Sequence, residues 1–185
     1  MSTESASPTD YGLGGSTNWL LGGAIGGVVG SLLFGALLWV FEPTIVTDTV
    51  PGIYGVDSGS ATIGWLFHLL HGLVLGLVFG AIVSREVILG TLTATTQFDV
   101  LEESGLAVRF VLAGAVYGLA IWAVLPVIGG QVLISVGTDP GFPAVAAESL
   151  AGHLLYGALL GALFSVFVEA EPDAETPFDD ADRDR

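Results

Sequence analysis

The sequence predicts an all-α, polytopic membrane protein with four transmembrane helices arranged as two parallel two-helix repeats. Of its 185 residues, 52% are hydrophobic and only 12% are charged, whereas soluble domains carry about 25% charged residues. The apolar residues are concentrated in four long uncharged runs, each close to the ~20 residues that a helix needs to cross a bilayer. A histidine-containing motif recurs in the second and fourth runs, and this recurrence predicts the repeat.

The predicted spans follow one another with short connections. They cover residues 19–41, 63–84, 108–130 and 146–168. The connections at 42–61 and 131–143 are rich in Pro and Gly, which is typical of turn-rich loops. The central connection, 85–106, is polar, and its periodicity leaves both a short surface helix and a loop open for residues 87–96. Together, residues 18–168 form the predicted transmembrane domain.

Glycines recur at every fourth position in the first span, at Gly22, Gly26 and Gly30. Small residues at this spacing let helix backbones approach closely in a membrane. The second span repeats the pattern at Gly72, Gly76 and Gly80. Tight helix packing is therefore predicted along both spans.

Two motifs indicate an internal duplication. His68-Leu-Leu-His-Gly in the second span matches His153-Leu-Leu-Tyr-Gly in the fourth, 85 positions later. Phe34-Gly-x-x-x-Trp in the first span matches Tyr117-Gly-x-x-x-Trp in the third. Because each repeat has an even number of spans, both insert with the same polarity, and a pseudo-twofold axis along the membrane normal is expected. His68 and His153 are then expected at one depth in the outer half of the bilayer.

The positions of the arginines predict the orientation. The chain contains four basic residues, all of them arginine, at Arg85, Arg109, Arg183 and Arg185. Two flank the central connection and two lie in the C-terminal tail, whereas the loops at 42–61 and 131–143 hold no cation. The positive-inside rule therefore predicts a multi-pass protein of the cell membrane with both termini cytoplasmic.

The charge balance is strongly acidic, with 19 Asp and Glu against 4 Arg and a net charge of −15. Such a balance excludes a nucleic-acid partner, which needs basic groups against its phosphates. We interpret the acidity as halophilic adaptation, because high salt screens the repulsion among the acids. The polar tail 1–17 and the acidic tail 169–185 lack the apolar side chains of a core and are predicted to be disordered.

The candidate site is an intramembrane polar cluster of His68, His71, His153 and Tyr156. Ionisable side chains inside a membrane are rare and usually face the bundle interior. One hypothesis is that neutral imidazoles hydrogen-bond between helices, with His71 facing Tyr156 and no cofactor bound. The alternatives are haem b with His68 and His153 as axial ligands, a divalent metal on the three histidines, and passage of protons or a solute.

No catalytic motif is present: the sequence lacks a Walker loop, a His-Glu-x-x-His motif and a Gly-x-Ser-x-Gly elbow. The prediction is therefore a non-enzymatic membrane protein, with a haem-binding electron-transfer subunit or a small channel or transporter as the alternatives. The predicted partners are the lipid bilayer and either further copies of the chain or a larger membrane complex.

Five segments carry a resemblance to a known family: Asn18-Trp-Leu, Ile53-Tyr-Gly, Gly64-Trp, His68-Leu-Leu-His and Gly152-His-Leu-Leu-Tyr-Gly. On these residues the chain resembles a family of small haloarchaeal four-span membrane proteins of unassigned function, over residues 18–168. The resemblance implies a four-span fold. Some members carry a histidine kinase label, which this sequence does not support, because it has no ATP-binding motif and its histidines lie at membrane depth.

Overall fold

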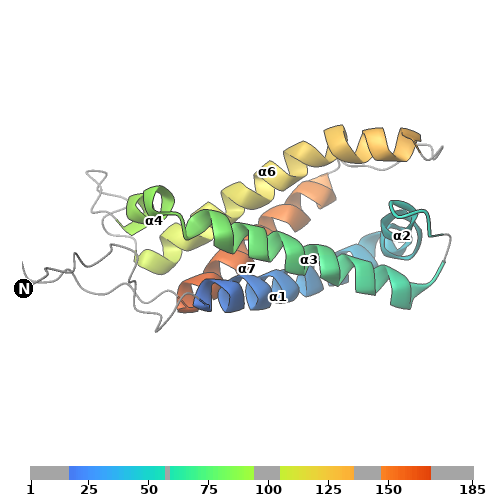
Figure 1. Ribbon diagram of the computed structural model, residues 1–185. Coiled ribbons are helices and arrows are strands. Elements are labelled where there is room, and N and C mark those ends of the chain that lie inside the picture. The colour runs from blue at the N-terminus through green and yellow to red at the C-terminus, as the bar shows by residue number, and fades with distance from the viewer. Residues whose placement is uncertain (1–16, 57–58, 94–104, 136–146, 168–185) are drawn as a thin grey trace, which may run out of the picture.

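The computed structural model describes residues 17–56, 59–93, 105–135 and 147–167 (Figure 1). These residues contain no β-strand and form four helices long and apolar enough to cross a membrane. The four are α1 (Asn18–Phe41), α3 (Ala61–Val83), α6 (Leu106–Ser135) and α7 (Ala147–Phe167). The predicted all-α, polytopic class is confirmed. The disorder predicted for 1–17 and 169–185 falls outside the described residues except at Thr17. The loop predicted at 131–143 is wrong over 131–135, which are part of α6, and the rest of it lies outside the described residues.

Each long helix lies close to its predicted span. Their first and last residues agree within two positions, except that α6 continues to Ser135, beyond the predicted end at 130. A helix is the structure that satisfies its own backbone groups in lipid, so the many glycines of α1 do not prevent it from forming. The helix ends at Phe41. Glu42, directly before Pro43, caps it, and its N–H bonds Leu38 O at 2.7 Å.

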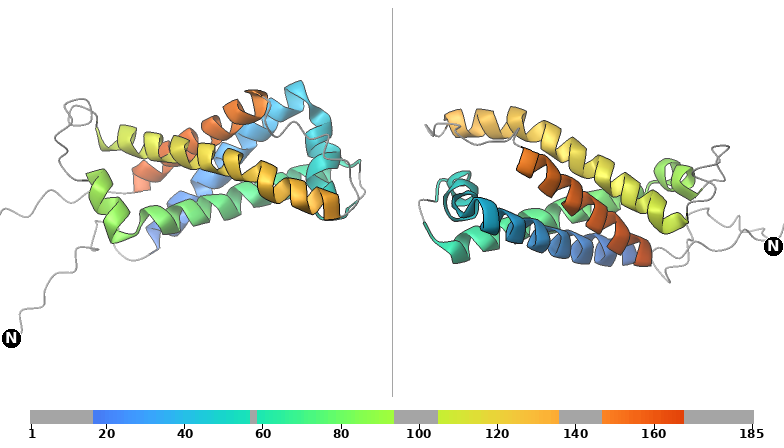
Figure 2. Two further views of the ribbon diagram at one scale, coloured as in Figure 1. Left: turned by 90° about the horizontal axis from the view of Figure 1, so that it is seen from above. Right: turned by 180° about the vertical axis from the view of Figure 1, so that it is seen from behind.

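Helix α1 lies between two neighbours, with α3 on one side and α7 on another, and α6 packs on the far side of α7 (Figures 1 and 2). Its two glycine rows serve different interfaces. Gly23 and Gly27 lie against the backbone of α3, where a Cβ atom on either would approach a carbonyl oxygen closer than 3.0 Å. The row Gly22, Gly26 and Gly30 instead receives large side chains of α7, namely Phe164, Leu160 and Tyr156.

The second hairpin, α6 and α7, is also joined backbone to backbone. A Cβ on Gly114 or Gly157 would collide with the carbonyl of the other, and Gly118 lies against the carbonyl of His153 in the same way. The close α1–α7 interface, however, has no counterpart of similar extent between α6 and α3 among the described residues. Exact twofold symmetry is therefore not observed, and the parallel repeat stays a prediction.

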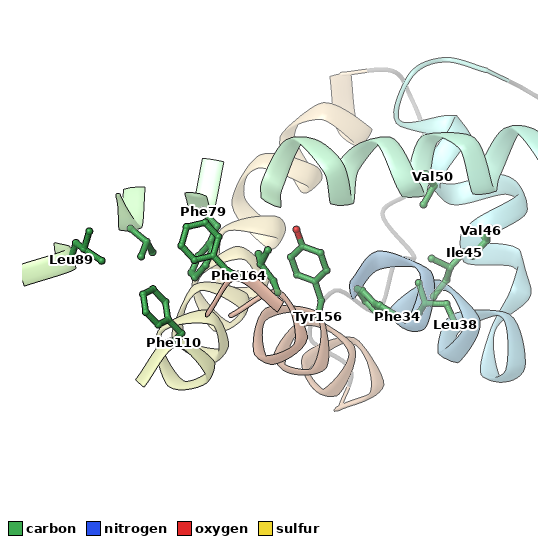
Figure 3. Packing of buried hydrophobic residues seen from close by; sticks show 12 residues of the cluster. Phe34, Leu38, Ile45, Val46, Val50, Phe79, Leu89, Phe110, Tyr156 and Phe164 are labelled. Atoms are coloured by element: carbon green, nitrogen blue, oxygen red, sulfur yellow. The ribbon is translucent and has the colours of Figure 1, made fainter. Parts of the chain in front are cut away.

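A row of aromatic and aliphatic side chains fills the interior (Figure 3). Phe79, Phe110 and Phe164 are almost fully buried, and the rings of Phe79 and Phe164 meet edge to face with centroids 5.5 Å apart. These two residues are 85 positions apart, the same interval that separates the two histidine motifs. The outward face of α3 is apolar at every fourth position, at Leu66, Leu70, Val74, Val78 and Ile82, as expected of a lipid-facing helix.

Three short helices complete the described structure. The first two, η1 (Ile45–Thr49) and α2 (Val50–Gly52), cover the end of α3 at one end of the bundle, and α4 (Glu86–Thr93) lies at the opposite end (Figure 1). The prediction of a loop at 42–61 is therefore wrong over 45–52. Val46 is fully buried against Gly64, and this packing stabilises a helical turn that the local turn formers do not indicate.

Candidate functional site

The two predicted histidines lie in the bundle interior against one aromatic ring. His68 on α3 and His153 on α7 are both 8% exposed. Phe34 of α1 contacts both imidazoles edge to face, with ring centroids 5.6 Å from His68 and 4.8 Å from His153. The two imidazole centroids therefore lie within about 10 Å of each other, and both rings contact Phe34. We call Phe34, His68 and His153 the paired-histidine site.

Glycine makes room for the central ring. The ring of Phe34 lies directly on Gly152, where any Cβ would overlap its edge. On the other side of α1, Gly35 leaves space for the side chains of His68 and Trp65, which themselves meet edge to face at 6.1 Å. The glycines next to Phe34 and His153 in the sequence are therefore what allows the rings to share one level of the bundle.

Each imidazole donates a hydrogen bond to a backbone carbonyl. His68 Nε2 donates to Ser31 O of α1 at 2.9 Å, which joins α3 to α1. His153 Nδ1 donates to Ser149 O, one turn earlier on its own helix, at 2.7 Å. Because a carbonyl only accepts, these bonds assign the proton to Nε2 in one ring and to Nδ1 in the other. The two histidines therefore present different nitrogens to their surroundings.

Tyrosine hydroxyls make a second set of bonds between helices. Tyr156 OH donates to Gly72 O at 2.9 Å, and in Figure 3 this hydroxyl points towards α3. Tyr117 OH of α6 donates to Leu75 O at 2.8 Å. Both acceptors lie on α3, within one turn of each other, so α6 and α7 are each anchored to α3 through one hydroxyl.

His71 does not join this group, and the prediction that it faces Tyr156 is wrong. Its ring stacks on Tyr54, and its Nε2 is hydrogen-bonded to the Tyr54 hydroxyl. Tyr54 also stacks on Phe67, one turn earlier, with centroids 4.6 Å apart. The physical reason is the position of Tyr54: His71 lies about 60° around the helix from His68, on the flank of α3 that the segment after α2 covers. His71 therefore fastens the segment after α2 to α3.

The four predicted polar residues are thus divided between three environments. His68 and His153 share Phe34. Tyr156 packs on Gly30, one turn before Phe34 on α1, and bonds to Gly72 O of α3. His71 lies with Tyr54. Among the described residues, no group of three His, Cys, Asp or Glu converges as a metal site. The alternative of a divalent metal on all three histidines therefore lacks the geometry that it requires.

Four residues of this region were not predicted as parts of the site: Phe34, Ser31, Tyr54 and Tyr117. Phe34 and Tyr117 occupy equivalent positions of the repeat motif, and that equivalence was the available signal. The contribution of Ser31 is a backbone carbonyl, which leaves no mark on the sequence. Tyr54 reaches His71 only because η1 and α2 fold back over α3.

Comparison of the chain with family models, with curated proteins and with solved structures finds no match. The class that the structure itself defines is a four-helix membrane protein with a buried histidine pair.

Proposed function

We propose that this protein is a non-enzymatic component of the cell membrane, in which the paired-histidine site holds α3 and α7 against α1. The observation that carries the proposal is the position of Phe34, whose ring contacts both imidazoles. An aromatic ring in contact with two imidazoles is a packing arrangement. Inside a membrane, such packing and hydrogen bonding between helices take the place of the hydrophobic effect in holding helices together.

The hydrogen bonds of the buried polar side chains support a role without catalysis. In the described structure these side chains are Ser31, His68, Ser149 and His153. Ser31 Oγ and both imidazoles donate to backbone carbonyls, and no serine hydroxyl is hydrogen-bonded to an imidazole. A serine nucleophile needs a base within hydrogen-bonding distance, and this arrangement provides none.

The haem alternative makes a different demand on the same residues. Two axial histidines need room for a porphyrin between their imidazoles, whereas here both imidazoles are packed against the ring of Phe34. His68 would also have to give up the hydrogen bond from Nε2 to Ser31 O. The packing role requires no such rearrangement, and the geometry therefore favours it.

Orientation and environment complete the proposal. Arg85 and Arg109 lie at the end of the bundle that carries α4, and we propose that this end is cytoplasmic. The net charge of −15 supports a high-salt environment, in keeping with the resemblance to haloarchaeal proteins. The apolar outer faces support lipid as the main partner, with further copies of the chain as a second partner.

A visible absorption spectrum tests the proposal against its haem alternative. The protein is produced in cells supplied with haem, purified in detergent, and compared with His68→Ala and His153→Ala variants. We expect no Soret band from any of the three, and reduced thermal stability in both variants. If the parent protein shows a bis-histidine haem spectrum that both variants lose, the packing role is wrong and haem-based electron transfer is supported.

A further inference from the structure

A second polar group lies beside the paired-histidine site, at the outer end of the α6–α7 hairpin. Trp122 Nε1 and Ser149 Oγ are both buried, and neither has a hydrogen-bond partner in the described structure. Ser149 as a residue is only 7% exposed. Buried polar atoms are rarely left without a partner, and an ordered small molecule is a common reason when they are.

The register of the two helices pairs these two positions. Along the hairpin, Gly114 lies against Gly157, and Gly118 lies against His153. Each step of four residues forward on α6 thus corresponds to four residues backward on α7. One turn further in the same direction, Trp122 is opposite Ser149.

His153 lies one turn from Ser149 on the same face of α7. Its Nδ1 donates to Ser149 O, so in the neutral ring Nε2 carries a lone pair and accepts. Trp122 Nε1 can only donate, and the Ser149 hydroxyl can do either. The hydrogen-bonding capacities of the three groups match a molecule that accepts one hydrogen bond and donates another.

The equivalent positions in the first hairpin are closed by protein atoms. Gly64 takes the place of Ser149, and the backbone of Val46 lies directly against it. Trp39 takes the place of Trp122, and it is 41% exposed, with its ring near Trp65. Only the second hairpin therefore combines a serine hydroxyl with a buried indole N–H at this level.

We propose that Trp122, Ser149 and His153 form a binding site for one water-sized, neutral molecule that both accepts and donates hydrogen bonds, and that water itself is the occupant. The bound molecule accepts from Trp122 Nε1 and donates to His153 Nε2 or Ser149 Oγ. It thereby links α6 to α7 at the level of the membrane where the glycine contacts between them end. The site shares His153 with the paired-histidine site, but its test reads the Trp122 indole and not the contact with Phe34.

Ultraviolet resonance Raman spectroscopy tests this site, because the indole bands report whether the N–H is hydrogen-bonded. Trp19→Phe, Trp39→Phe and Trp65→Phe leave Trp122 as the only tryptophan. We expect a hydrogen-bonded indole in this protein and a shift towards the free indole when Ser149→Ala or His153→Leu is added. Ser31→Ala is the matched control, because Ser31 Oγ bonds Val28 O within α1, and it should leave the spectrum unchanged.

If the protein with a single tryptophan does not fold, NMR of the full chain labelled with ¹⁵N-tryptophan gives the same information, and Trp122→Phe assigns the signal. We then expect cross-relaxation between the Trp122 indole proton and water, which Ser149→Ala reduces. A free indole N–H in the parent protein, or a bonded one that neither Ser149→Ala nor His153→Leu changes, would overturn the proposal by either method.

Discussion

The imidazole of His153 lies edge-on against the ring of Phe34, with the two centroids 4.8 Å apart. The contact joins α7 to α1, and His68 of α3 contacts the same ring. Three helices that are distant in the sequence therefore converge on one phenylalanine. If this convergence holds these three helices together, its removal has measurable consequences.

Phe34→Ala should destabilise the protein by about 3 kcal/mol, the lower end of the values found when a buried Phe is changed to Ala. Phe34 is 7% exposed, and the smaller side chain would leave both imidazoles without their shared neighbour. Unfolding in detergent, followed by circular dichroism, measures the loss. The control is Leu33→Ala at a position that is 45% exposed, where little change is expected. Equal effects at the two positions would show that Phe34 has no special role.

Gly157→Ala should separate α6 from α7. A Cβ at this position would collide with the carbonyl of Gly114, so the helices must move apart, at a cost of about 1–3 kcal/mol. Gly90→Ala on α4 is the matched control, because a Cβ there meets no atom within 4 Å. The control should be neutral or slightly stabilising, since Ala favours a helix over Gly. Thermal unfolding of both variants is the measurement: we expect a lower melting temperature for Gly157→Ala and an equal or higher one for Gly90→Ala.

Removing the hydroxyl of Tyr156 should have a small but measurable effect. Tyr156→Phe keeps the ring that packs on Gly30 and deletes only the bond to Gly72 O. Interhelical hydrogen bonds of this kind contribute about 0.6 kcal/mol on average in membrane proteins. Tyr117→Phe, which deletes the bond to Leu75 O, should give a similar loss. A loss as large as that of Tyr156→Leu would mean that ring packing, and not the hydrogen bond, had been disturbed.

The orientation of the bundle predicts opposite labelling at its two ends. The chain has no cysteine, so single-cysteine variants report one position each. Thr44→Cys, between α1 and η1, should react with a membrane-impermeant maleimide on intact cells. Val87 on α4, at the opposite end of the bundle, is 80% exposed. Val87→Cys should react only after permeabilisation. The reverse pattern would invert the predicted topology.

Much of this architecture could be predicted from the sequence, because it depends on properties that are local in the chain. The lengths of the apolar runs predict the spans, and the glycine spacing predicts close packing. The choice of partner for each glycine row is not local. Gly23 and Gly22 are neighbours in the sequence, yet one contacts the backbone of α3 and the other the side chains of α7. That choice depends on how all the helices pack.

The candidate site was predicted only in part, for the same reason. The repeat correctly indicated that His68 and His153 are buried. It could not show that Phe34 contacts both of them, because the approach of α1 to α7 arises from tertiary packing. It also gave His71 and Tyr156 a common environment on the basis of their matching positions. In the structure, His71 is instead bound by Tyr54, which η1 and α2 carry over α3.

Crosslinking of positions 68 and 153 tests the central claim most directly, namely that the two histidines share one buried site. His68→Cys and His153→Cys are combined and treated in membranes with a reagent spanning ~10 Å, about one interhelical distance. A protease site introduced in the connection at 94–104 separates the halves on a gel unless they are crosslinked. The control combines Leu70→Cys with Leu155→Cys. These two residues have the same spacing in the sequence as the histidines, but both are exposed. We expect the 68–153 pair to hold the halves together and the 70–155 pair to release them. If the two halves of a folded 68–153 variant separate after cleavage, the shared site is contradicted.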